Sequence, residues 1–332
     1  LAASAQKKFS VYAVGFYNQE NLFDTCHDEG KKDYEYLPNK GWNGMKYTNK
    51  LRNMSKALAD MGTDVLPNVG CAFIGLSEVE NHKVLDALVD QAPLKARNMK
   101  YVHIEGPDRR GIDCALLYNP SLFSVKNVKL LPYVQELAKD SAFFTRGFLT
   151  VRGEMAGDDV AVIVCHWPSR FSGPFYRESA ARQVKVIKDS LLNVNQEMKI
   201  FVMGDMNDDP VNKSMHVYLQ AKPEISQVGA GDMYNPWYNV LAKEGKGTLF
   251  YSGNWNLFDQ IVITPNLLNK DAKKKDYSSL KYWKSHIFRR DYLIQQEGQY
   301  KGAPLRTTAG GRWLNGYSDH LPVVMYLVKE KK

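Results

Sequence analysis

The sequence predicts an α/β fold in which two β-sheets are covered by helices. Strand-like and helix-like patterns alternate along the 332 residues, and further strand-like runs follow near the carboxyl end. Alternation of this kind places sheets against layers of helices. Several apolar runs are continuous, which is typical of strands buried on both faces. Because no linker-like or repeated segment interrupts the pattern, we expect residues 1–332 to form a single domain.

The strands are predicted from short apolar runs that stop at polar residues. In chain order they cover residues 9–17, 73–77, 113–118, 160–165, 200–203, 260–264 and 323–328. The helices are predicted from apolar residues recurring every three or four positions, as in Leu51, Met54 and Leu58. They cover residues 48–61, 83–91 and 179–193, and Gly62 is a typical terminator of the first.

Chemically active residues stand at the ends of these runs. The run that ends at Gly204 is followed by Asp205 and Asn207, so a carboxylate and an amide lie two residues apart. Ligands of open α/β sheets bind at the carboxyl ends of the strands. The other polar residues at or near run ends include Asn18, Glu78, His166, Asp259, Asp319 and His320.

The acidic residues of this set indicate a metal site. Glu78, Asp205, Asp259 and Asp319 would be costly to bury unpaired, and a divalent cation would offset their repulsion. Oxygen ligands favour Mg²⁺, with Mn²⁺ or Ca²⁺ as alternatives. The simpler interpretation of each acid alone is a surface ion pair at a strand end, which contributes little.

The histidines and amides suggest hydrolysis of a phosphoester. Asp259 is a candidate to fix the tautomer of His320, and a histidinium can hold a phosphoryl oxygen. Asn18 and Asn207 could orient water, although asparagine is also common in turns. The sequence contains neither a Gly-x-Ser-x-Gly elbow nor a P-loop. It therefore does not support catalysis by a covalent serine intermediate or P-loop binding of nucleotide phosphates.

Positive charge is concentrated in one part of the chain. The formal net charge is +8, and between Lys270 and Arg312 eleven basic residues face four acidic ones. Aromatic residues are interleaved with them, so we interpret residues 266–317 as a basic aromatic insertion within the domain. It could contact phosphates and bases, or it could be a solvated insertion whose aromatic residues pack it down.

The remaining composition is that of a globular protein, with 44% hydrophobic and 24% charged residues. No apolar stretch reaches the roughly 20 residues of a membrane span, and we expect a monomer. The cysteines do not have zinc-ligand spacing. Residues 1–6 are similar to the tail of a removed signal peptide, which favours a periplasmic or secreted protein over a cytoplasmic one.

Taken together, the motifs resemble the endonuclease/exonuclease/phosphatase superfamily, and the similarity spans residues 18–322. Its specific motifs are Gly-Asp-Met-Asn at 204–207 and Ser-Asp-His-Leu-Pro at 318–322. Ser77-Glu78, Cys165-His166 and the segments 110–118 and 258–262 add support. The superfamily includes deoxyribonuclease I, exonuclease III-type nucleases, sphingomyelinases and inositol polyphosphate 5-phosphatases. Residues 17–25 resemble bacterial members of unassigned substrate.

The resemblance implies a four-layer α/β sandwich of the deoxyribonuclease I type, with two mixed sheets face to face and helices outside. It implies that Glu78 binds Mg²⁺ with help from Asn18 and Asp319, with Asn21 as an alternative to Asn18.

The resemblance also implies roles in catalysis. Asp205 would orient or activate water, and Asn207 would steer it. His320, paired with Asp259, would act as base or phosphate ligand, and His166 would contact the scissile phosphate and protonate the leaving oxygen. Arg110 and Arg170, which lie in or beside these motifs, are expected to bind substrate.

Three functions are compatible with this sequence. The first is a Mg²⁺-dependent phosphodiesterase or endonuclease that attacks nucleic acid with water, which the basic aromatic tract favours. The second is a phosphatase or phosphodiesterase on a phosphoinositide, sphingomyelin or another small phosphoester. The third is a non-catalytic binding module on the same fold, against which the complete set of site residues argues.

Overall fold

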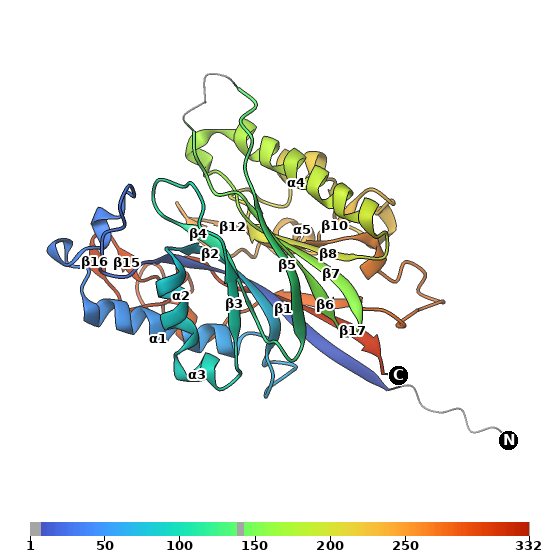
Figure 1. The fold of residues 1–332 in the computed structure, drawn as a ribbon, viewed down its shortest axis with the longest axis horizontal. Helices are drawn as coiled ribbons and strands as arrows, with labels where there is room; N and C mark the ends of the chain where they lie inside the picture. The colour runs from blue at the N-terminus through green and yellow to red at the C-terminus, as the bar shows by residue number, and fades with distance from the viewer. Residues whose placement is uncertain (1–7, 138–142, 332) are drawn as a thin grey trace.

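The computed structural model describes residues 8–137 and 143–331. These residues form four layers, with two β-sheets packed face to face and helices outside them, so the predicted α/β sandwich is confirmed (Figure 1). The signal-peptide-like segment 1–6 lies outside the described residues. Within the described ranges, none of the helices combines the length and the apolar character of a membrane span.

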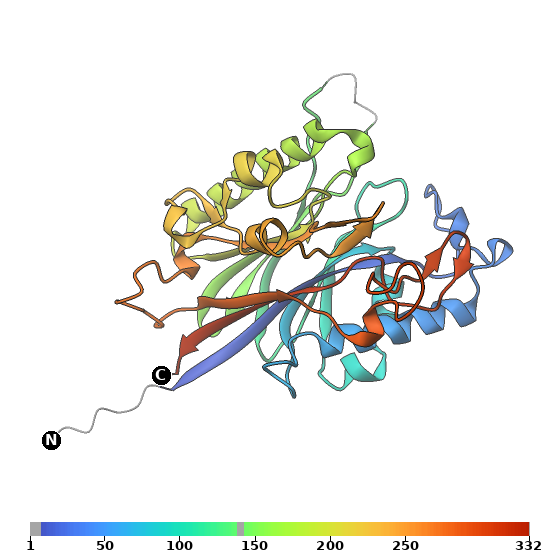
Figure 2. The same ribbon diagram turned by 180° about the vertical axis from the view of Figure 1, so that it is seen from behind.

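The first sheet has six strands, and its β1 and β2 run parallel while its other pairs are antiparallel. In spatial order the strands are β14 (Lys281–Ile287), β17 (Val323–Glu330), β1 (Phe9–Leu22), β2 (Cys71–Val79), β4 (Asp113–Tyr118) and β3 (Lys100–His103). Segments from both ends of the chain therefore lie side by side at its centre, as the blue β1 and red β17 show in Figure 2.

The second sheet has seven strands, and its centre is a parallel pair, β7 and β8, flanked by antiparallel neighbours. In spatial order the strands are β5 (Phe123–Leu131), β6 (Phe148–Met155), β7 (Asp158–His166), β8 (Lys199–Asp205), β13 (Asp259–Ile263), β10 (Met233–Tyr234) and β9 (Ala221–Lys222). Two short hairpins lie outside the sheets: β11 (Leu249–Tyr251) with β12 (Asn254–Asn256), and β15 (Thr308–Ala309) with β16 (Arg312–Trp313).

The helices form the outer layers. The first sheet is covered by α1 (Gly44–Asp60), α2 (His82–Val89) and α3 (Ala92–Lys95), and the second by α4 (Pro174–Val194), with the short α5 (Trp237–Ala242) nearby. The side chains of Asn43 and Asn81 cap α1 and α2 by accepting hydrogen bonds from first-turn backbone N–H groups. The cap explains why the first helix begins four residues before its predicted start at residue 48.

Three apolar layers hold the sandwich together. In β2, Phe73 packs between the two sheets while the next residue, Ile74, packs against α1 and α2. In β7, Val162 likewise faces the other sheet while Ile163 faces α4. Because both faces of these central strands are buried, their sequences are continuously apolar, as predicted.

All seven predicted strands and all three predicted helices are present, but four strands of four or more residues were missed. They are β3, β5, β6 and β14. Of these, β3, β5 and β14 lie at sheet edges, where lysines and other polar residues interrupt the apolar pattern and discourage pairing with another chain. Part of the basic tract, residues 281–287, is thus an edge strand, and the interpretation of residues 266–317 as an insertion stays a prediction.

Gly204, directly before Asp205, allows β7 and β8 to approach closely. A Cβ at this position would collide with the carbonyl group of Cys165 in the neighbouring strand. We therefore expect Gly204→Ala to lower the free energy of unfolding by about 1–3 kcal/mol or more, as measured by urea denaturation.

Gly44 is a matched control, because a Cβ there would meet no atom within 4 Å. Gly44→Ala at the start of α1 should leave the stability unchanged or raise it by less than about 1 kcal/mol. Equal stabilities for the two alanine variants would contradict the steric explanation.

Candidate active site

Three neighbouring strands of the second sheet place three candidate residues side by side. In the strand register His166 is opposite Asp205, and Asp205 is opposite Asp259. His166 and Asp205 end the parallel strands β7 and β8, and Asp259 begins the antiparallel β13. The pairing of the sheet therefore forces these three side chains to one edge.

The first sheet contributes its residues through irregular backbone. The pairing of β1 with β2 shifts register between Asn18 and Leu22, and Glu20 and Asn21 there have φ angles of 45° and 55°. Glu78, opposite this bulge in β2, has a φ angle of 60°. Bulges turn side chains in new directions and are frequent beside active sites. The strained conformation directs Glu78 toward the second sheet, where it approaches His166.

The predicted catalytic and metal residues form one chain of short distances. Glu78 Oε1 lies 3.9 Å from His166 Nε2, and the same nitrogen lies 3.6 Å from Asp205 Oδ2. The distance from Asp205 Oδ2 to His320 Nε2 is 3.8 Å. The structure therefore brings together residues that are up to 242 positions apart in the sequence.

His320 and Asp259 form a direct, buried hydrogen-bonded pair. His320 Nδ1 donates to Asp259 Oδ2 over 2.7 Å, and both side chains are almost fully buried. The hydroxyl of Thr248 donates to the same carboxylate oxygen. Burial lowers the pKa of His320, but the carboxylates of Asp259, Asp205 and Asp319 prevail and raise it well above its ordinary value. The charged imidazolium is thus favoured.

His166 lies in a different electrostatic environment. Burial, followed by the nearby positive charges of Arg146 and Arg110, holds the pKa of His166 well below its ordinary value. Its Nδ1 atom is buried and has no hydrogen-bond partner among the described residues. The two histidines of the site therefore favour different protonation states.

Asp205 lies between the two histidines. Asn18 Nδ2 donates to its Oδ2 atom over 3.0 Å, and the backbone N–H of Asn207 donates to its Oδ1 atom. Burial raises the pKa of Asp205 to about 7, with further contributions from Asp259 and Glu78 against the lowering effect of His320. A carboxyl group with this pKa can exchange a proton near neutral pH.

Asn207 and Arg170 are held by local contacts. The Asn207 amide donates to the carbonyl oxygen of Trp167 over 2.8 Å. Arg170 is exposed, pairs with Asp209 over 3.0 Å and donates to the Asn207 carbonyl. These contacts give Arg170 a structural role in the 207–209 turn, and its substrate contact stays a prediction.

Arg110 lies at the mouth of the site. It donates to Asn21 Oδ1 over 2.7 Å, and the backbone N–H of Asn21 donates to Glu78 Oε2. Asn21, the alternative to Asn18, therefore positions the glutamate through its backbone. Asn18 instead contacts Asp205 and, through its Oδ1 atom, the backbone of Glu20.

Asp319 is part of a network of ion pairs and hydrogen bonds that was not predicted from the sequence. Its carboxylate lies 3.4 Å from Arg306, which also donates to the buried Glu20 over 2.9 Å. Lys50, fully buried in α1, donates to the hydroxyl of Thr307 over 2.6 Å. The network joins α1, the β1 bulge and the 306–307 segment beneath the site.

The described residues fit a divalent cation. One ligand atom each from Glu78, His166 and Asp205 lies within 4.8 Å of the others, and so does one each from Asp205, Asp259 and His320. In the second group, His320 and Asp259 lie close together because they form a direct hydrogen bond. Glu78, His166 and Asp205 have no such bond among themselves, so their proximity is better explained by a shared cation. The assignment of Asn18 and Asp319 to the metal stays a prediction.

Other residues missed at the sequence level position those that were found. Arg146 donates to the carbonyl oxygens of both His166 and Trp167, and Ser318 donates to the Asn18 carbonyl. Thr248 orients Asp259. Ser318 belongs to the Ser-Asp-His-Leu-Pro motif at 318–322. No local sequence pattern indicates a role for Arg146 or Thr248, because their partners are distant in the sequence.

Comparison with known proteins supports the same family. The sequence model of the endonuclease/exonuclease/phosphatase family matches residues 13–329. No curated protein matches the chain. Solved structures are similar in fold at low sequence identity, as three of them show.

An endonuclease/exonuclease/phosphatase family protein from Bacteroides thetaiotaomicron has a TM-score of 0.57 at 14% identity and covers 98% of this chain and 97% of its own. D. rerio TDP2 complexed with single strand DNA product has a TM-score of 0.55 at 11% identity, with coverages of 96% and 99%. The B. thetaiotaomicron mannosyl-6-phosphatase has a TM-score of 0.57 at 14% identity, with coverages of 95% and 99%. With the family match over nearly its whole length, this chain belongs to the endonuclease/exonuclease/phosphatase family.

Proposed function

We propose that this protein is a Mg²⁺-dependent phosphoester hydrolase that acts on phosphodiester bonds of nucleic acid. The observation that carries the hydrolase proposal is the buried cluster in which Asp205 lies between His166 and His320, with Glu78 beside it. Such a set supplies an acid–base group, phosphate ligands and metal ligands at one point.

The geometry supports an in-line attack of water on phosphorus. Asp205, fixed by Asn18 and by the Asn207 backbone, accepts a proton from the attacking water. His320 as imidazolium, held by Asp259, stabilises the negative charge on a phosphoryl oxygen. Bound Mg²⁺ would polarise the phosphoryl group and offset charge on the leaving oxygen.

His166 lies 3.6 Å from Asp205 and would contact the same phosphate as His320. Its neutral imidazole can donate a hydrogen bond to a phosphoryl oxygen, and it has no additional proton for the leaving group. We therefore propose His166 as a phosphate ligand, in place of the leaving-group acid that the resemblance implies.

The basic tract favours nucleic acid as substrate. Arg306 lies at the cluster, and Arg289 and Lys301 line a neighbouring hollow, so the positive charge extends away from the site along one side. A polyanion with successive phosphates matches such an arrangement better than a single phosphate does.

A small phosphomonoester is the second candidate. A hollow of about 330 Å³ adjoins Glu20 and Asn21 and contains aromatic side chains together with Lys40 and Lys46. It could hold a compact leaving group, and the structurally similar mannosyl-6-phosphatase is named for such a substrate. The two candidates differ in how much of the substrate lies beyond the scissile phosphate.

Removal of a catalytic group tests the hydrolase proposal. We expect Asp205→Asn and His320→Ala each to lower kcat for a phosphodiester by at least about 100-fold, since each removes an acid–base or charge-stabilising group. Glu154→Gln, in an exposed ion pair with Lys126, is the matched control and should retain full activity. Unchanged activity in both site variants would favour the non-catalytic binding module.

Metal binding is testable without an activity assay. Saturating Mg²⁺ should raise the melting temperature of the wild-type protein, with a stabilisation of about 2.7 kcal/mol at a hundredfold excess over Kd. In Glu78→Gln this response should be lost, while the metal-free variant should be no less stable because a like charge is removed. A Mg²⁺ response equal to that of the wild type would exclude Glu78 as a ligand.

A substrate panel separates the two candidates. With Mg²⁺, we expect cleavage of single-stranded oligonucleotides at a kcat/KM at least about tenfold above that for a sugar phosphate, and a decline as salt rises because phosphate contacts are screened. Release of phosphate from the sugar phosphate without any oligonucleotide cleavage would establish the second candidate.

A further inference from the structure

A separate pocket lies on the other side of the loop that carries His320. It has a volume of about 530 Å³ and is formed between the β11–β12 region and the segments 285–289 and 299–303. Leu321, one residue after His320, is part of its wall, and the Leu321 backbone N–H donates to the Thr248 carbonyl. The pocket is thus adjacent to the proposed catalytic histidine and contains none of the proposed catalytic residues.

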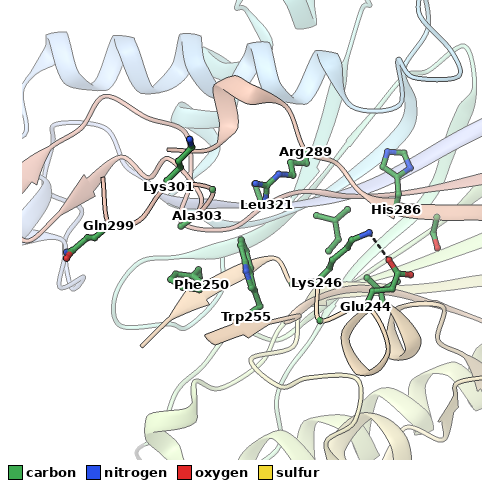
Figure 3. A pocket seen from close by; sticks show the side chains of 16 residues that line it. Glu244, Lys246, Phe250, Trp255, His286, Arg289, Gln299, Lys301, Ala303 and Leu321 are labelled. Carbon is green, nitrogen blue, oxygen red and sulfur yellow. Dashed lines mark hydrogen bonds and ion pairs between the residues drawn. The ribbon is translucent and has the colours of Figure 1, made fainter. Parts of the chain in front are cut away.

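The two walls of this pocket differ in chemistry. Phe250 and Trp255 extend from the β11–β12 hairpin, with ring centroids 5.2 Å apart, and Figure 3 shows Trp255 directed toward the opposite wall. That wall carries the exposed Arg289 and Lys301. Within the described residues, neither of these cations has an ion pair or a side-chain hydrogen bond, whereas Lys246 is paired with Glu244. The pocket therefore combines an aromatic surface with two positive charges that no acidic side chain of the described residues pairs with.

A second hollow lies between this pocket and the candidate active site. It has a volume of about 430 Å³ and shares Phe250 and Ala303 with the first pocket. At its other end it is lined by Asp319 and Arg306. Its wall also contains Tyr251 and Tyr300, whose exposed fractions of 71% and 52% leave their rings accessible. The two hollows together thus form a path from Asp319 to Trp255 that is lined by aromatic rings and cationic side chains.

We propose that this pocket binds a nucleotide unit of single-stranded nucleic acid, remote from the scissile phosphate. The base stacks on Trp255 and Phe250, and Arg289 and Lys301 bind the adjoining phosphates. Tyr251 and Tyr300 contact the intervening nucleotides. This inference rests on the proposed function and adds to it the form of the substrate, a single strand longer than a dinucleotide.

The shape and charge of the pocket favour this occupant over others. Stacking requires bases whose faces are free, which a single strand offers and a duplex does not. A membrane surface would match a flat basic face, whereas here the cations border a recess with aromatic walls. A lone small phosphate would leave Trp255 and Phe250 without a partner.

Binding of fluorescein-labelled oligothymidylate of about twelve nucleotides tests the proposal, with thymidylyl dinucleotide as the short probe. In an Asp205→Asn background, which slows cleavage, Arg289→Ala/Lys301→Ala and Trp255→Ala should each raise Kd for the long probe at least about fivefold. The double variant should also reduce the slope of log Kd against log salt by about 0.7 for each lost phosphate contact. Trp255→Phe should restore most of the affinity.

The matched control is Lys274→Ala/Lys275→Ala, which removes two exposed charges from the same basic tract outside the pocket. It should leave Kd for the long probe within about twofold of the parent, unlike the Arg289/Lys301 pair. If both double variants lost the same affinity for the long probe, net charge alone would explain the effect, and the proposal would be overturned. Binding to anionic lipid vesicles that depends on Arg289 and Lys301, without oligonucleotide binding, would also overturn it.

Hydrolysis assays in the otherwise wild-type protein separate this inference from the proposed function. The Arg289→Ala/Lys301→Ala variant should raise KM for the long oligonucleotide and leave hydrolysis of bis(p-nitrophenyl) phosphate unchanged, because that diester is too short to reach the pocket. If the wild-type protein cleaves oligonucleotides and the variant has the same KM, the pocket proposal fails alone. If the wild type binds the long probe through the pocket but cleaves no nucleic acid, the proposed function fails and the pocket assignment is retained.

Discussion

The ion pair between His320 and Asp259 joins the two halves of the site. Asp259 begins a strand of the second sheet, and His320 precedes β17 of the first, so their 2.7 Å contact links the two sheets at a shared edge. Both side chains are buried, where an unpaired charge would be costly. The pairing favours the charged form of His320 and leaves its Nε2 atom 3.8 Å from Asp205 Oδ2. Thr248, on the segment leading into β11, holds the carboxylate in place.

Backbone irregularity is the second requirement of this arrangement. A regular β1–β2 pair would direct successive side chains to alternate faces of the sheet. The bulge at Glu20 and Asn21 and the left-handed φ angle of Glu78 break that alternation. They bring the Asn21 backbone to Glu78 and the Glu20 carboxylate to Arg306. Packing of the sheets over the apolar layers supplies the stability that offsets this strain.

Much of the fold and most of the site could be predicted from local sequence. Central strands are apolar on both faces, so their positions were evident, and Glu78, His166, Asp205, Asp259 and His320 stand at their ends. Edge strands such as β5 and β14 were missed because their exposed polar residues remove the pattern. Lys50, Arg146 and Thr248 were missed because each acts on a residue far away in the chain.

The sequence by itself determined the family, the layered α/β architecture and the identity of the residues in the cluster, because motif and periodicity are local properties. The tertiary structure alone decided how those residues are distributed around Asp205 and why the two histidines favour different protonation states, since both depend on burial and on neighbours that are distant in the sequence. It also resolved the basic tract into an edge strand and a pocket wall, where Arg289 and Lys301 line the same recess as Trp255. The sequence determines how many charged residues the protein has, but the packing of the chain determines where they lie on the surface.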